Sequence, residues 1–137
     1  MTDSGGPLLG PFRAFGGDAL RDVWVFDGDT ESCLFIRDDV TDYLEGHDPE
    51  PYIDNERYGY ITRDTYEDLT YASYEYTVRG LDEFVQFRTF LDDDTGTRFG
   101  VLASFDVRRV DDRFGDLYER LASVGEDVTF ASLGDQS

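Results

Sequence analysis

The sequence predicts an α+β fold: a five-stranded, mainly antiparallel sheet with helices on one face and an amphipathic C-terminal helix. Three observations lead to this prediction. Two β-rich runs flank a turn at residues 27–29, as in a hairpin. Further runs between residues 74 and 105 are joined by short turns, as in a three-stranded meander. The apolar residues between 114 and 124 recur at the spacing of one helical face.

The N-terminal segment is predicted to form a short helix or turn packed on the sheet. Its apolar residues follow a loose helical spacing, which Pro11 and the pair Gly16-Gly17 interrupt. The hairpin follows, and Gly28 with its aspartate neighbours supplies the positive-φ positions of its turn. The expected hairpin strands are residues 20–26 and 33–36.

A helical excursion separates the hairpin from the meander. Asp38-Asp39 is placed to cap a short helix that Gly46 ends. Two prolines make residues 47–55 a loop, and residues 62–71 are expected to form a second short helix. Hairpin, excursion and meander thus follow one another along the chain.

The meander and the C-terminal helix complete the fold. Asp111 is placed to cap that helix and Gly125 to end it, and the run 128–130 is compatible with an added edge strand. The expected meander strands are residues 74–78, 84–91 and 99–105. No Pro/Ser-rich linker or repeat divides the chain. We therefore expect a flexible N-terminus at 1–7, a single domain at 8–125 and a C-terminal extension at 126–137.

The charge balance predicts a protein adapted to concentrated salt. All 12 basic residues are arginine, 31 residues are acidic, and the net charge is -19. Such a chain repels itself at ordinary ionic strength, whereas molar salt shortens the Debye length to about 3 Å. An apolar content of 39% argues against disorder. We therefore expect the protein to work in the cytoplasm of a halophile, which is rich in potassium ions.

Composition also excludes several classes of partner and site. The arginines are scattered among carboxylates instead of forming a basic stripe, so nucleic acid is not expected. The apolar runs are too short to span a bilayer and the first residues lack a basic signal-peptide region, so we expect a cytoplasmic protein without membrane contact. Cys33 is the one cysteine, which excludes an internal disulfide and a cysteine zinc site.

No residue pattern predicts catalysis, a metal or a cofactor. His47 is the one histidine and lies in a loop, and Cys33 is best interpreted as a small buried hydrophobe. Without lysine, P-loop and Schiff-base chemistry lack an essential residue. The acidic runs 27–31 and 92–94 miss the calcium-loop pattern and are expected to be solvated turns. We expect a protein that is not an enzyme.

Four arginines form the candidate interaction or anion site, namely Arg37, Arg57, Arg79 and Arg88. Arginine is the residue of choice for holding planar anions, because its guanidinium presents a fixed fork of donors. In the meander, Arg79 and Arg88 are expected to project from the face opposite the helices, together with Thr77, Gln86 or Glu75. An anion or acidic peptide could dock there; the alternative is cross-strand ion pairing with Glu75 or Asp38.

Tyrosines add a second candidate surface. Eight of the 9 tyrosines fall between residues 43 and 76, and Tyr58 and Tyr60 are part of the candidate site. Tyrosine joins a large contact area to a polar tip, which suits a recognition surface. It equally suits the edge of a core in a protein that lacks lysine stems, and both interpretations stay open.

Two resemblances follow from these patterns. The order of elements is similar to the profilin-like or roadblock-like architecture, which overlaps PAS and GAF topologies and constrains function only weakly. A second resemblance rests on the segments 20–23, 35–40, 54–60, 74–79 and 100–106 and on their order and spacing. Through these segments, residues 18–124 resemble a family of small haloarchaeal proteins with no assigned function, which implies a halophile and brings no activity.

The leading functional hypothesis is a non-enzymatic protein-interaction or regulatory module. It would bind a protein partner or self-associate through a free sheet edge or the C-terminal helix. The alternative is a sensory domain of PAS or GAF type that binds a small ligand between the sheet and residues 52–71. An enzyme that uses His47 or a carboxylate pair is the third hypothesis.

Overall fold

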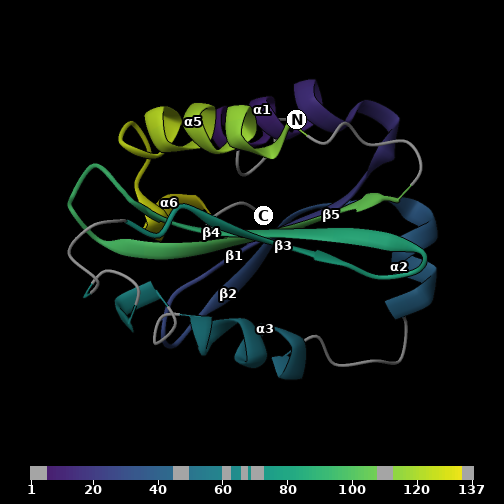
Figure 1. Ribbon diagram of the computed structural model, residues 1–137, viewed down its shortest axis with the longest axis horizontal. Coiled ribbons are helices and arrows are strands. Elements are labelled where there is room, and N and C mark those ends of the chain that lie inside the picture. The colour runs from purple at the N-terminus through teal and green to yellow at the C-terminus, as the bar shows by residue number, and fades with distance from the viewer. Residues whose placement is uncertain are drawn as a thin grey trace.

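The computed structural model describes residues 6–44, 50–59, 63–65, 68, 73–107 and 113–133. Five antiparallel strands form one open sheet in the order β2-β1-β5-β4-β3 (Figure 1). The strands are β1 (Leu20–Phe26), β2 (Glu31–Ile36), β3 (Tyr76–Gly80), β4 (Phe84–Asp92) and β5 (Arg98–Asp106). The predicted α+β class, with its hairpin, meander and C-terminal helix, is confirmed.

Helices lie on both faces of this sheet. Two of them, α1 and α5, pack side by side on one face, whereas α3 lies on the other (Figure 1). The expectation that the helices gather on one face therefore holds for α1 and α5 but not for α3. The helices are α1 (Gly6–Gly16), the 3-10 turn Gly17–Ala19, α2 (Asp38–Leu44), α3 (Glu50–Arg57), α5 (Phe114–Gly125) and α6 (Phe130–Leu133).

The main core lies between the sheet and the α1/α5 layer. Phe87 of β4 stacks on Phe114 of α5 at 5.8 Å between ring centres, and Phe12 of α1 packs edge-on against Phe87. The buried stripe of α5 includes Phe114, Leu117 and Leu121, as the apolar spacing predicted. Burial of such side chains supplies the main stabilisation of the fold, about 1.5–3 kcal/mol for each large residue.

A smaller core explains why α3 takes the opposite face. Ile53 of α3 is 2% exposed and packs with Phe26, Phe90 and Leu102, whose side chains leave the sheet on that side. The ring of Phe26 lies over Gly100, where a Cβ atom would come within 2.3 Å of it. An apolar residue on α3 and a glycine on the central strand β5 together create this second layer.

The β1–β2 turn forms where predicted, but a side chain holds it. Asp27 accepts hydrogen bonds from the backbone N–H groups of Asp29 and Thr30 at 2.8 and 2.7 Å. Among the described residues, the glycines with positive φ are Gly17 and Gly96, so the expected positive-φ role of Gly28 is wrong. The aspartate supplies the acceptor that closes the turn.

The acidic turn between β4 and β5 also differs from the expected solvated turn. Asp93 is 6% exposed and accepts bonds from the backbone N–H groups of Phe130 at 2.8 Å, Thr95 and Thr97. The N–H of Asp94 donates to the carbonyl of Val128 at 2.8 Å. These bonds dock the chain after α5 onto the turn. The edge strand expected at 128–130 is wrong, because residues 128 and 129 join no strand and α6 begins at Phe130.

Candidate functional site

A buried cluster of charges lies between α3 and the sheet. The carboxylate of Glu56, on α3, accepts from Arg88 at 3.1 Å and from Arg79 at 3.0 Å. Glu56 is 3% exposed and Arg88 is 7% exposed. One carboxylate thus bridges two guanidinium groups from neighbouring strands, of which that of Arg88 is buried with it.

Strand register brings the two arginines together. Thr77 pairs with Arg88 and Arg79 pairs with Gln86 across β3 and β4, so the four side chains share one face of the sheet. Arg88 donates to Thr77 at 3.0 Å and Arg79 donates to Gln86 at 2.8 Å. This is the face opposite α1 and α5, as the sequence predicted. It is not open, however, because α3 covers it.

Arg88 is held tightly in this cluster. Its Nη2 group also donates to the hydroxyl of Tyr74 at 3.3 Å, and its guanidinium lies 5.4 Å from the ring centre of Phe90. Its Nε group is buried without a hydrogen-bond partner. A Cβ atom at Gly59 would come within 2.6 Å of the guanidinium carbon, so glycine is needed there for the close approach.

The partner of these arginines differs from the one expected. Glu75 and Asp38 were the proposed ion-pair partners, whereas Glu56 takes that role. Glu56 comes from the helical excursion, far from both strands in the sequence. The side chain of Arg88 is 8% exposed and that of Arg79 is 41% exposed, so of these two arginines only Arg79 has a substantial surface in contact with solvent.

Arg37 and Arg57 are also engaged by groups of the chain itself. Arg37 donates to Asp106 at 2.8 and 3.0 Å and to Asp39 at 2.6 and 3.0 Å, which ties the end of β2 to the end of β5. Its guanidinium lowers the pKa of Asp39 by hydrogen bonding. These contacts are bidentate arginine–carboxylate pairs.

Arg57 joins α3 to the β1–β2 hairpin. It donates to the carbonyls of Asp27 at 2.7 Å and Thr30 at 3.0 Å, and it pairs with Glu31 and Asp54. The four predicted arginines therefore lie in three separate clusters: Arg79 with Arg88, Arg37 at one end of the sheet, and Arg57 at the hairpin. In each cluster the guanidinium already holds an internal carboxylate.

The tyrosine part of the candidate site is only partly described. Tyr58 is 68% exposed and follows α3. Tyr60 and His47 lie outside the described residues. The exposure of Tyr58 agrees with a contact surface, and it shows that this tyrosine is not part of a core edge.

Two ionisable groups on β1 and β2, the carboxyl of Asp22 and the thiol of Cys33, have raised pKa values. Burial, followed by the charge of Asp22, raises the pKa of the Cys33 thiol to about 11. Burial also raises the pKa of Asp22, although its carboxylate accepts a 2.6 Å hydrogen bond from the hydroxyl of Ser104. A thiol with this pKa is protonated near neutral pH and is a poor nucleophile or metal ligand.

Within the described ranges no group of three or more His, Cys, Asp or Glu side chains is arranged to hold a metal ion. In the same part of the chain, no helix is long and apolar enough to cross a membrane.

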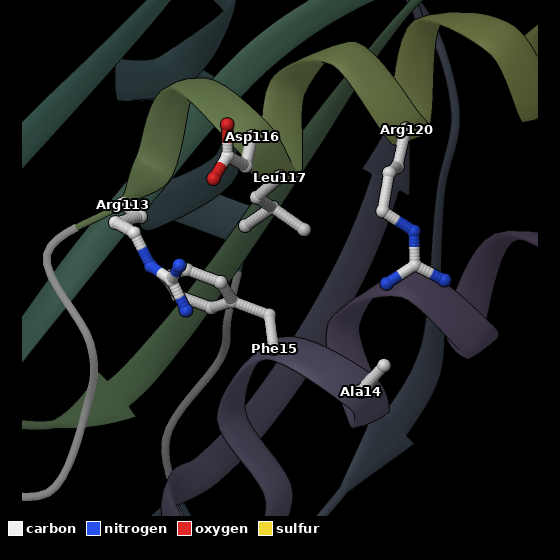
Figure 2. Close-up of a pocket in the computed structure, with 6 residues that line it drawn as sticks. All are labelled: Ala14, Phe15, Arg113, Asp116, Leu117 and Arg120. Atoms are coloured by element: carbon white, nitrogen blue, oxygen red, sulfur yellow. The ribbon is translucent and has the colours of Figure 1, made fainter.

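A second site, on the α1/α5 layer, was not predicted. A hollow of about 170 Å³ lies between the two helices and is lined by both arginines and apolar groups. Figure 2 shows Arg120 of α5, and Arg113 just before that helix, reaching toward α1 on either side of Leu117. The lining residues are Ala14, Phe15, Arg113, Asp116, Leu117 and Arg120. The sequence signal for this site is the charged face of the C-terminal helix, which carries Asp116 and Arg120.

These features define a small α+β domain with one antiparallel sheet and helices on both faces. Its predicted arginines form ion pairs with carboxylates of the same chain. The chain belongs to the family described as Domain of unknown function (DUF7522), which matches residues 7–126. The expected membership of a family without an assigned function is thereby confirmed. No curated protein and no solved structure matches the chain.

Proposed function

We propose that this chain is a non-enzymatic protein-interaction module that self-associates through the free edge of β3. The observation that carries the proposal is an apolar patch beside an edge strand. In the described part of the chain β3 pairs with β4 alone and lies at the end of the sheet. Val78 on β3 and Leu81 just after it are 40% and 39% exposed.

An edge strand of this kind can accept another strand. Its outward N–H and C=O groups offer hydrogen bonds, and exposed apolar side chains beside it add contact area. The edge is also held rigid, because Arg79 on β3 is fixed by Glu56 and Gln86. Antiparallel pairing of β3 with β3 of a second copy would form an isologous dimer with one continuous sheet.

Salt adaptation belongs to the same proposal. Two copies that each carry a charge of -19 repel one another, and molar salt weakens that repulsion by shortening the Debye length to about 3 Å. The absence of lysine and the excess of acidic residues support a haloarchaeal cytoplasm rich in potassium ions as the working environment. The order of hairpin, excursion and meander supports the proposed profilin-like or roadblock-like architecture.

Multi-angle light scattering tests the association in about 3 M KCl, a concentration at which screening is nearly complete. The wild-type chain is expected to show a concentration-dependent dimer. Val78→Glu places a charge in the centre of the patch and should give a monomer. Gly28→Glu is the matched control, since Gly28 is exposed in the β1–β2 turn at the far end of the sheet from β3, and nothing lies within 4 Å of its Cβ position. A wild-type monomer at every concentration would overturn self-association.

The small-ligand alternative placed its site between the sheet and residues 52–71. In the described part of that region, Ile53 and Glu56 pack directly against the sheet. A ligand-binding role therefore finds its support elsewhere, at the hollow between α1 and α5.

A further inference from the structure

The hollow between α1 and α5 combines positive charge with an apolar floor. Arg113 and Arg120 reach into the space between the helices, and Phe15 on α1 and Leu117 on α5 line it (Figure 2). The ring of Phe15 is fixed by Phe105 at 5.5 Å and by Phe114 at 5.0 Å between ring centres. The floor is therefore a rigid part of the core edge and not a mobile side chain.

Arg120 is an exception among the described arginines. It makes no hydrogen bond, ion pair or ring contact in that part of the chain, although acidic residues outnumber arginines by 31 to 12. Elsewhere the chain engages its guanidinium groups with its own carboxylates, as at Arg37, Arg57 and Arg88. An arginine left without a carboxylate at a concave site is available to hold one from outside.

The size of the hollow limits what can enter. Its volume of about 170 Å³ is below the roughly 300–1,000 Å³ of pockets that enclose drug-sized ligands. It suits a group the size of one side chain or a small organic acid, and not a nucleotide. Guanidinium forks match planar carboxylates, and the partly exposed ring of Phe15 would contact an apolar body attached to the carboxylate.

We propose that the α1/α5 hollow is a carboxylate-binding site. Arg120 holds the carboxylate, and the partly exposed ring of Phe15 contacts the apolar part of the ligand. Asp116, which also lines the hollow, weakens binding through its like charge. The proposal goes beyond self-association, because the hollow lies on the helical layer and uses no residue of β3.

The carboxylate can come from a free organic acid or from an acidic side chain of a peptide. NMR titration of the full-length protein, at constant ionic strength set with KCl, distinguishes the two. The probes are benzoate, its neutral isostere benzamide, inorganic phosphate, and a short glutamate-containing peptide amide with its glutamine counterpart. We expect benzoate to give saturable shifts of backbone amides near Ala14, Leu117 and Arg120, and benzamide to give none.

Three variants assign the binding to the site. Arg120→Gln should weaken benzoate about tenfold or more, because a hydrogen bond to a charged group is lost. Asp116→Asn should strengthen it severalfold, which a merely structural role for these residues would not produce. Arg98→Gln is the control: this arginine lies on β5, is 40% exposed, pairs with Asp64 and should leave binding unchanged.

Each outcome has a defined meaning. Binding of benzoate but not of the glutamate peptide identifies a free acid as the ligand. Binding of the glutamate peptide, with displacement of benzoate, identifies an acidic peptide as the ligand. Either result supports the proposal. Equal shifts with benzoate and benzamide, no saturable shifts, or unchanged binding in Arg120→Gln would overturn it. Phosphate binding as tight as benzoate would overturn the selectivity for carboxylates.

Discussion

Glu56 and Arg88 form an ion pair at 3.1 Å in which both side chains are nearly buried, at 3% and 8% exposure. The pair joins α3 to β4 and fixes α3 on the face of the sheet opposite α1 and α5. Burial makes this contact sensitive to the loss of one partner, because the remaining charge cannot be hydrated.

Replacing Glu56 by alanine should therefore lower the free energy of unfolding by about 3–5 kcal/mol. Both Arg88 and Arg79 lose their carboxylate, and Arg88 stays buried without compensation. Urea denaturation at fixed salt measures the change. The double variant Glu56→Leu/Arg88→Met should cost clearly less than the sum of the two single changes. A loss below about 1 kcal/mol in Glu56→Ala, as for an exposed pair, would contradict the buried bridge.

Gly59 is the second contact that keeps Arg88 in place. In Gly59→Ala the new methyl group would come within 2.6 Å of the guanidinium and 2.9 Å of the Phe90 ring. Overpacking of this kind costs about 1–3 kcal/mol. Gly10→Ala on α1 is the matched control, since nothing lies within 4 Å of its Cβ position. Thermal unfolding of Gly10→Ala should show a gain of about 0.5–1 kcal/mol, because alanine favours helix.

Asp93 should make stability depend on acid pH. Burial opposes its ionisation, but hydrogen bonds from the amide of Phe130 and from Thr95 and Thr97 outweigh that effect and lower its pKa to about 2. Because this pKa lies below the ordinary value of 3.8, the stabilisation is complete above about pH 4 and is lost as the pH falls toward 2. Denaturation midpoints between pH 5 and 2 should fall less steeply in Asp93→Asn than in the wild type. Parallel curves for the two proteins would contradict this role.

Cys33 should react slowly with thiol reagents in the folded state. Its pKa of about 11 leaves a very small thiolate fraction at pH 8, and the side chain is half-buried. Modification by a disulfide reagent at pH 8 should be at least about tenfold faster in denaturant than in the native protein. Equal rates in the two states would show that the thiol is neither protected nor perturbed.

The charge of -19 predicts a requirement for salt. Far-UV circular dichroism and thermal unfolding should show a cooperative fold in about 3 M KCl and its loss on dialysis into dilute buffer, since screening falls sharply between the two. An equal concentration of NaCl is the control for a specific potassium effect. A spectrum that does not change between molar and dilute salt would refute the adaptation to concentrated salt.

The strands and the C-terminal helix were predictable because their signals are local. The strand signals at 74–78 and 99–105 are local, although β3 begins later, at Tyr76, and β5 is buried throughout from Phe99 to Phe105 instead of alternating. The apolar stripe from Phe114 to Leu121 depends on neighbours within two turns. The shared face of Arg79 and Arg88 also followed from strand periodicity. The turn at Asp27 was placed correctly, but its chemistry was not, because a side-chain acceptor replaced the expected glycine conformation.

The candidate site was predictable only in part, for a related reason. Periodicity placed Arg79 and Arg88 together, but it could not select Glu56 from 31 acidic residues. That choice depends on α3 crossing to the second face, which Ile53 and the small core around Phe26 determine. The hollow at Arg120 likewise exists only once α1 packs beside α5.

The sequence by itself determined the five strands and the C-terminal helix, their order, the excess of negative charge and the arginines as the scarce cations, but it predicted a loop where α3 forms. The tertiary structure decided which helix covers which face, which carboxylate meets which arginine, and which arginine is left available. The physical reason is range: hydrophobic periodicity and turn chemistry act between near neighbours, whereas burial and ion pairing depend on residues brought together only by the folded chain.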